Sequence, residues 1–206
     1  MKEIKQALRN GEHIEVQYSD DTAEKVCVQE VRGGLMLPTA ESPAYFCILG
    51  QLLERNSKFK HPCILLSETE AALPEQFYKK LSNEARKLLC WTFFCDYTDS
   101  NYEFRVSLSK YLRKRDLSRI SIKLPYIGDW VNGILTIRQS SEDGVLKIPK
   151  DSIMGRQLGQ MTPGDQQESQ RGRFYAVDAL RCVLGSFERP SRSWTGFTER
   201  KDFYYG

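Results

Sequence analysis

The chain has 206 residues, of which 40% are hydrophobic and 28% are charged, and its formal net charge at pH 7 is +3. This composition is typical of a globular protein and excludes collagen-like and intrinsically disordered classes. No stretch approaches the roughly 18 consecutive apolar residues of a membrane span, and the N-terminal segment lacks the apolar core of a signal peptide. We therefore expect a cytoplasmic protein with no membrane partner.

The cysteines and histidines argue against a zinc site. None of the six cysteines forms a C-x-x-C pair, and most lie in apolar runs such as YFCILG and HPCILL. Scattered cysteines in such runs are usually reduced core residues. With only two histidines in the chain, a zinc site of spaced Cys and His ligands is not expected. A hard-metal site built on carboxylates stays open.

The N-terminal third of the chain predicts one helix and a series of strands. Residues 2–10 resemble a short helix that ends at Gly11, and the pair Gly33-Gly34 is expected to interrupt the strands that follow. Short alternating or apolar runs with turn-like flanks predict strands. They are expected at 13–18, 24–31, 35–40, 44–53 and 61–68. The last three favour an antiparallel meander.

Helices and strands alternate in the rest of the chain. Pro74 suits a first helical turn, residues 100–103 (SNYE) form a capping box, and Asp129 is expected to cap a helix. Residues 162–173 are polar and predict a mobile loop. The expected helices are 73–89, the one opened by 100–103, 128–139, 150–161 and 174–187, and the expected strands are 91–97, 119–126 and 144–149. This order predicts an α/β fold, in which a mixed sheet of three antiparallel strands followed by alternating helices and strands is flanked by helices.

Two acids stand where a ligand site is favoured. Asp96 lies at the end of the short aromatic strand WTFFCDY, and ligands of open α/β sheets lie at the carboxyl ends of central strands. Asp178 lies inside FYAVDALRCVLGSF, the most apolar helical run of the chain. Each acid also has an ordinary interpretation, because acids are common in turns and stabilise the first turn of a helix through its dipole.

The element order resembles the ribonuclease-H-like fold, and more narrowly the C-terminal nuclease domain of the large terminase subunit of tailed phages. Three motifs carry this resemblance: GGLMLPTAESPAYFCILG, CDYTDSNYEFRVSL and FYAVDALRCVLGSF. The resemblance divides the chain into an N-terminal extension of a helix and a hairpin (1–32), a nuclease-type domain (33–188) and a basic, aromatic tail (189–206). There is no G-x-x-x-x-G-K-[ST] loop, so ATP hydrolysis of that type is not expected.

The resemblance implies a site for two Mg²⁺ or Mn²⁺ ions. In that family, acids on the first strand, at the end of the fourth strand and on the last helix hold the ions, which stabilise the attacking and leaving oxygens of a phosphodiester. Asp96 matches the fourth-strand acid and Asp178 the last-helix acid, but Leu37 aligns with the first-strand acid. The acids that could replace it are Glu70, taken as the third catalytic residue, Glu68, taken as a further metal ligand, and Asp99.

A basic segment follows the first of these acids. Residues 105–123 carry seven basic side chains against one acid. Such a run can bind phosphates, although more often it is a solvated helix face. The residues predicted to contact DNA are Lys110, Arg113, Lys114, Arg115 and Arg119. The aromatic and basic side chains of 189–206 could stack on bases, or could pack on the domain or remain disordered.

Two hypotheses follow from the sequence. In the first, a terminase-nuclease-like domain binds DNA and, if active, cleaves it with Mg²⁺ or Mn²⁺ during phage or prophage DNA packaging. In the second, the ribonuclease-H-like fold has lost catalysis, as Leu37 suggests, and acts as a binding or assembly module. Both place the protein in the cytoplasm of a bacterial host cell, with DNA or other packaging proteins as partners.

Overall fold

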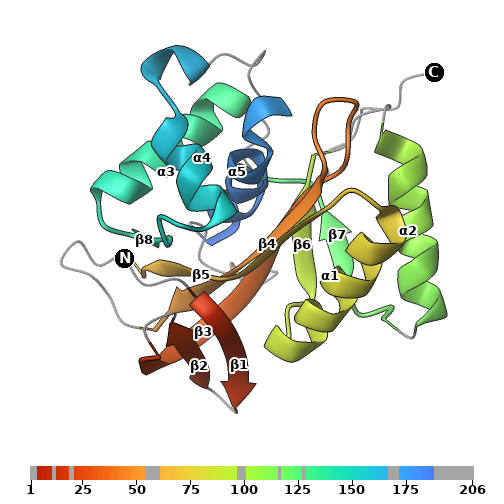
Figure 1. Cartoon of the computed structure of the whole chain (residues 1–206), viewed down its shortest axis with the longest axis horizontal. Helices are drawn as coiled ribbons and strands as arrows, with labels where there is room; N and C mark the ends of the chain where they lie inside the picture. Colours follow the sequence, from red (N-terminus) through yellow and green to blue (C-terminus); the bar gives the residue numbers. More distant parts are fainter. Residues whose placement is uncertain are drawn as a thin grey trace, which may run out of the picture.

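A computed structural model describes residues 4–10, 13–18, 21–53, 61–96, 101–115, 117–126, 129–166 and 172–187. In this part of the chain, one mixed sheet lies between helices on both of its faces (Figure 1). The strands are β1 Ile4–Asn10, β2 His13–Tyr18, β3 Ala23–Met36, β4 Ala44–Leu52, β5 Cys63–Ala71, β6 Thr92–Cys95, β7 Ser121–Lys123 and β8 Leu146–Lys147. The helices are α1 Pro74–Leu88, α2 Tyr102–Lys114, α3 Trp130–Glu142, α4 Ile153–Gln160, the 3-10 helix η2 Pro163–Gln166, and α5 Tyr175–Phe187.

The strand order is β1-β2-β3-β4-β5-β8. Off this path, β6 pairs with β3, and β7 pairs with β6. The strands β3, β4 and β5 form the predicted antiparallel meander, whereas β6 runs parallel to both β3 and β7. All nine residues of β4 are buried, as expected for a central strand with both faces covered. The predicted fold class, a mixed α/β sheet flanked by helices, is confirmed.

The N-terminal helix predicted at 2–10 is wrong, because the structure has strand β1 there. It pairs antiparallel with β2, with Ala7 opposite Val16, and both side chains are buried. Helical propensity over a short segment is a weak preference. Pairing with β2 and burial of one face outweigh it.

The predicted break at Gly33-Gly34 is also wrong, because the run 24–31, both glycines and the first two residues of the run 35–40 belong to the single strand β3, which ends at Met36. A Cβ at Gly33 would collide with the ring of Phe93, and one at Gly34 with the carbonyl oxygen of Ala179 in α5. The glycines therefore serve close approach of neighbouring groups rather than a turn. Strand β3 also runs across residues 32 and 33, where the boundary between the N-terminal extension and the nuclease-type domain was predicted.

Other boundaries follow local capping. Asp129 caps α3 as predicted, because its side chain accepts a hydrogen bond of 2.9 Å from the backbone N–H of Val131. The capping box at 100–103 is wrong: α2 begins at Tyr102, and its N-cap is Asn101, whose side chain makes no capping hydrogen bond to the helix. Within the predicted loop 162–173, residues 163–166 form η2, and 167–171 lie outside the described residues.

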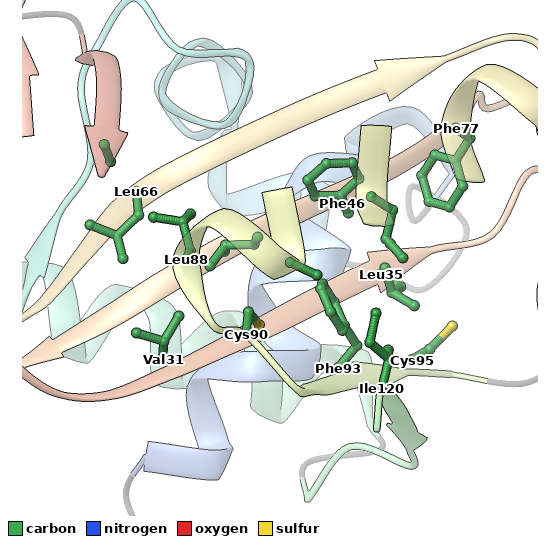
Figure 2. Packing of buried hydrophobic residues seen from close by; sticks show 14 of the residues in the cluster. Val31, Leu35, Phe46, Leu66, Phe77, Leu88, Cys90, Phe93, Cys95 and Ile120 are labelled. Atoms are coloured by element: carbon green, nitrogen blue, oxygen red, sulfur yellow. The ribbon is translucent and has the colours of Figure 1, made fainter. Parts of the chain in front are cut away.

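Two apolar clusters fill the spaces on either side of the sheet. The first joins the sheet to α1 and α2, and Figure 2 shows Phe46, Phe77 and Phe93 among its side chains. The second joins the other face to α3, α4 and α5. Five of the six cysteines are buried and none forms a disulfide, so the prediction of reduced core thiols is confirmed.

Helix α5 is the most enclosed helix in the described part of the chain. It packs on β3, β4 and β6 and is covered on its other side by α3 and α4 (Figure 1). Every residue from Ala176 to Ser186 is buried, including an aspartate and an arginine. A charged side chain in such a place needs a charged partner. No helix in the described part of the chain is long and apolar enough to span a membrane.

We predict that Gly34→Ala destabilises the protein by about 1–3 kcal/mol, the usual cost of overpacking a core, because α5 must move away from β3. Urea unfolding measures this change. Gly159→Ala in α4 is the matched control, since a Cβ there meets no atom within 4 Å and alanine favours the helix. A Gly34→Ala protein as stable as the parent would contradict the close approach of α5.

Candidate functional site

The two acids singled out by the sequence lie together, joined by an arginine. Asp96 follows the last residue of β6, and Asp178 and Arg181 lie one turn apart in α5. The Nε of Arg181 donates to Oδ1 of Asp178 at 2.7 Å, and its Nη2 lies 2.7 Å from the same oxygen. That Nη2 also donates to Oδ2 of Asp96. One guanidinium thus bridges two carboxylates from separate elements.

This ion cluster is largely shielded from water. Asp178 is 0% exposed and Arg181 1% exposed, while the side chain of Asp96 keeps 18% of its exposure. In a medium of low polarity, charges need close partners with good geometry, and removing one partner leaves an uncompensated buried charge. The cluster therefore holds α5 against the end of β6.

A glycine in α3 makes room for the arginine. A Cβ at Gly133 would collide with Cγ and Cδ of Arg181. The aliphatic stem of Arg181 therefore lies directly over the backbone of α3, and its head reaches the carboxylates beyond. Gly133 thus plays a packing role, which allows α3 and α5 to approach closely.

The carboxylates of Asp96 and Asp178 could hold one metal ion only if that ion replaced the guanidinium of Arg181. Ligand atoms of Asp96, Asp178 and Cys182 lie within 4.8 Å of one another, but both carboxylates are bonded to Arg181. Burial, and then the nearby charge of Asp178, raises the pKa of the Cys182 thiol well above its ordinary value, so the thiol is neutral. Two hard divalent ions need more oxygen ligands than these two acids offer.

Strand β3, the neighbour of β6, places no acid beside Asp96, and its register with β6 differs by one residue from the alignment at Leu37. Leu35 of β3 lies opposite Cys95 of β6, which places Met36 level with Asp96. Successive strand residues point to opposite faces: Met36 packs on the cluster that contains α5, whereas Leu37 belongs to the cluster under α1 and α2. Met36 therefore stands where a first-strand carboxylate would be needed.

The carboxylate of Glu68 is hydrogen-bonded to α4 and to Tyr45. One of its oxygens accepts from the backbone N–H of Ile153 at 2.5 Å, and the other from the N–H of Met154 at 3.1 Å and from the hydroxyl of Tyr45 at 2.6 Å. Burial raises the pKa of Tyr45 well above its ordinary value, which keeps this phenol a donor. A carboxylate that binds the free N–H groups of a first turn stabilises the helix. Glu68 thus anchors α4 to the sheet.

Glu70 reaches α5 but not the ion cluster. It is exposed and accepts a hydrogen bond from the hydroxyl of Tyr175, the first residue of α5. Among the described residues, the group of metal-ligand atoms contains neither Glu68 nor Glu70. Asp99 lies outside the described residues.

The basic stretch lies at the other end of β6. All five residues predicted to contact DNA are exposed. Helix α2 begins beside the acid end of β6 and runs back along the sheet (Figure 1). At its far end, Arg86 of α1 donates to the carbonyl of Arg115 at 3.0 Å, and the N–H of Ser121 donates to the carbonyl of Trp91 at 2.8 Å, just before β6. Proximity in sequence to Asp96 therefore does not bring the basic end of α2 to the acids.

Solved structures of phage large terminases share this fold. The large terminase of a thermophilic bacteriophage is 13% identical with a TM-score of 0.55, over 77% of this chain and 40% of that chain. The large terminase nuclease of the thermophilic phage G20c, with bound zinc, is 11% identical with a TM-score of 0.51, over 90% of this chain and 94% of that chain. This chain thus spans well under half of the first of these terminases. No protein-family model and no curated protein sequence matches the chain.

These likenesses confirm the predicted ribonuclease-H-like fold, which resembles that of a terminase nuclease. At such identities the fold is shared and the chemistry must be argued from the residues. No role was predicted from the sequence for Arg181, Gly133 or Met36. The spacing D-A-L-R places acid and arginine on one helix face, which is the signal that could have revealed the pair within α5.

We predict that Arg181→Met lowers the stability of the fold by about 3–5 kcal/mol, the usual effect of removing one partner of a buried ion pair. Chemical denaturation measures it, with Arg156→Met on the exposed surface of α4 as the control. Because the variant frees both carboxylates, Mn²⁺ should raise its thermal midpoint and leave that of the parent unchanged. Unaltered stability of Arg181→Met would contradict the bridging role.

Proposed function

We propose that this chain is a DNA-binding module with the fold of a terminase nuclease and without two-metal cleavage. The observation that carries the proposal is the bonding of Arg181 to both Asp96 and Asp178. Two-metal cleavage uses such carboxylates to hold divalent ions against the reacting oxygens of a phosphodiester. Here the guanidinium of Arg181 neutralises their charge. It stays protonated and accepts no proton.

Two observations favour DNA as the partner. The solved structures that share this fold include a phage large terminase and a large terminase nuclease. Helix α2 and the residues after it also expose cations that can contact phosphates, a contact that provides affinity without sequence preference. By the same likeness we propose a role in phage or prophage DNA packaging, beside other packaging proteins, in the cytoplasm of a bacterial host. The proposed DNA-contacting residues are Lys110, Arg113, Lys114, Arg115 and Arg119.

A second candidate is a metal-dependent endonuclease, favoured by the ligand atoms of Asp96, Asp178 and Cys182 that lie within 4.8 Å of one another. This function requires Arg181 to leave the two carboxylates when Mg²⁺ or Mn²⁺ arrives. It also requires a further acid, for which Glu70 is the candidate because it already contacts the first turn of α5.

Nicking of supercoiled plasmid in Mn²⁺ separates the two functions. We expect the parent to cut no faster than Asp96→Asn or Asp178→Asn, because the first proposal has no metal-bound water to attack the phosphodiester. Thermal unfolding of each preparation checks that the proteins are folded. Cleavage by the parent that both substitutions abolish would overturn the proposal in favour of the endonuclease.

DNA binding is measured on the same preparations by fluorescence anisotropy in the presence of EDTA. We expect binding without metal, with log K falling against log salt at a slope of about −3, as for three to four phosphate contacts on duplex DNA. Absence of binding at low salt would contradict DNA as the partner and point to a protein partner instead.

A further inference from the structure

The cations of α2 separate into two sets that face different grooves. One groove, of about 550 Å³, lies between α1 and α2. The other, of about 350 Å³, lies between α2 and residues 117–122 and is lined by Arg105 and Arg113 with an apolar floor. The basic stretch is therefore not one continuous surface.

The groove between α1 and α2 has cations on both of its walls. Lys79 projects from α1, and Lys110, Lys114 and Arg115 line the opposite side. Lys110 and Lys114 are one helical turn apart, so they follow each other along the groove at a spacing of about 6 Å. Among the described residues, Glu75 is the only carboxylate in the lining.

These cations are available for a ligand. Within the part of the chain that the structure describes, no ion pair is formed by Lys79, Lys110 or Lys114, and all three are exposed. Among the described residues that line the groove, four positive charges face one negative charge, and this excess favours a polyanion. The groove thus differs from an ordinary solvated helix face, where charges of both signs alternate.

Two tyrosines, Tyr78 and Tyr111, line the groove. The rings of Tyr78 and Tyr111 are 5.3 Å apart, and the guanidinium of Arg115 lies 5.5 Å from the centre of the Tyr111 ring. The backbone carbonyl of Arg115 is held by Arg86 of α1. An arginine stacked on a ring keeps the edge of its guanidinium free for phosphate oxygens.

We propose that the groove between α1 and α2 binds the phosphodiester backbone of one nucleic-acid strand, either single or part of a duplex. This inference rests on the proposed DNA binding and narrows its surface to Lys110, Lys114 and Arg115, with Lys79 added from α1. The groove lies on the opposite face of the sheet from α5 (Figure 1). A strand bound there would be separated by the sheet from Asp178 and Arg181.

The test compares three variants by fluorescence anisotropy with labelled single-stranded and duplex oligonucleotides in EDTA. The groove variant is Lys79→Gln/Lys110→Gln/Lys114→Gln. The charge-matched control is Lys25→Gln/Lys147→Gln/Lys150→Gln, which removes three exposed lysines from β3, β8 and the loop after β8. The third variant, Arg113→Gln/Arg119→Gln, removes cations outside the groove.

We expect the groove variant to lose about tenfold or more in affinity and its salt slope to become shallower by about 2–3, since each phosphate contact contributes about 0.7–0.9 to the slope. The control should change by less than about twofold, and all thermal midpoints should stay the same because the side chains are exposed. The oligonucleotide that loses more affinity identifies whether a single strand or a duplex is the ligand.

The outcomes separate this inference from the proposed function. Equal loss in the groove variant and the control would mean diffuse attraction by net charge and would overturn the groove. A larger loss in Arg113→Gln/Arg119→Gln would place binding on the other side of α2, which overturns the groove and keeps DNA binding. A parent that binds neither oligonucleotide at low salt would overturn both.

Discussion

The guanidinium of Arg181 lies between the carboxylates of Asp96 and Asp178, in a region largely shielded from water, and the arrangement of three elements depends on it. The arginine comes from α5, one acid follows β6, and the stem of the arginine rests on α3 at Gly133. Because each charge compensates the others, none can be removed without leaving a buried charge alone. The cluster therefore fixes the last helix on the sheet, independently of any bound ion.

The same cluster explains how the fold can persist where its site differs from a two-metal arrangement. A pair of close carboxylates repel each other unless a cation lies between them. In this chain the cation is part of the helix that carries one of the acids. Met36, level with Asp96 on the neighbouring strand, adds an apolar contact where a further acid would increase that repulsion.

Much of the fold could be predicted from sequence because its signals are local. Pro74 in the first turn of α1 and the cap at Asp129 each decide the structure of a few neighbouring residues. Strand β1 was missed because its state is set by pairing with β2. The two carboxylates of the site were found by position alone, but Arg181 meets Asp96 across 85 positions of the chain, a contact that no local pattern contains. Gly33 and Gly34 were misinterpreted because a glycine that ends a strand and one that admits a close neighbour look the same in sequence.

The continuity of β3 has a consequence for how the protein unfolds. Its first residues pair with β2, its last residues pair with β6 on the same edge, and β4 runs along its other edge. The N-terminal hairpin of β1 and β2 and the strand β6, which ends before Asp96, are thus hydrogen-bonded to the same strand β3, with no linker between them. Elements that pair with one continuous strand tend to open as one cooperative unit. We expect amides of β2 and of the second half of β3 to exchange their hydrogens with a common free energy of opening, so that a disturbance of the hairpin is felt at the ion cluster.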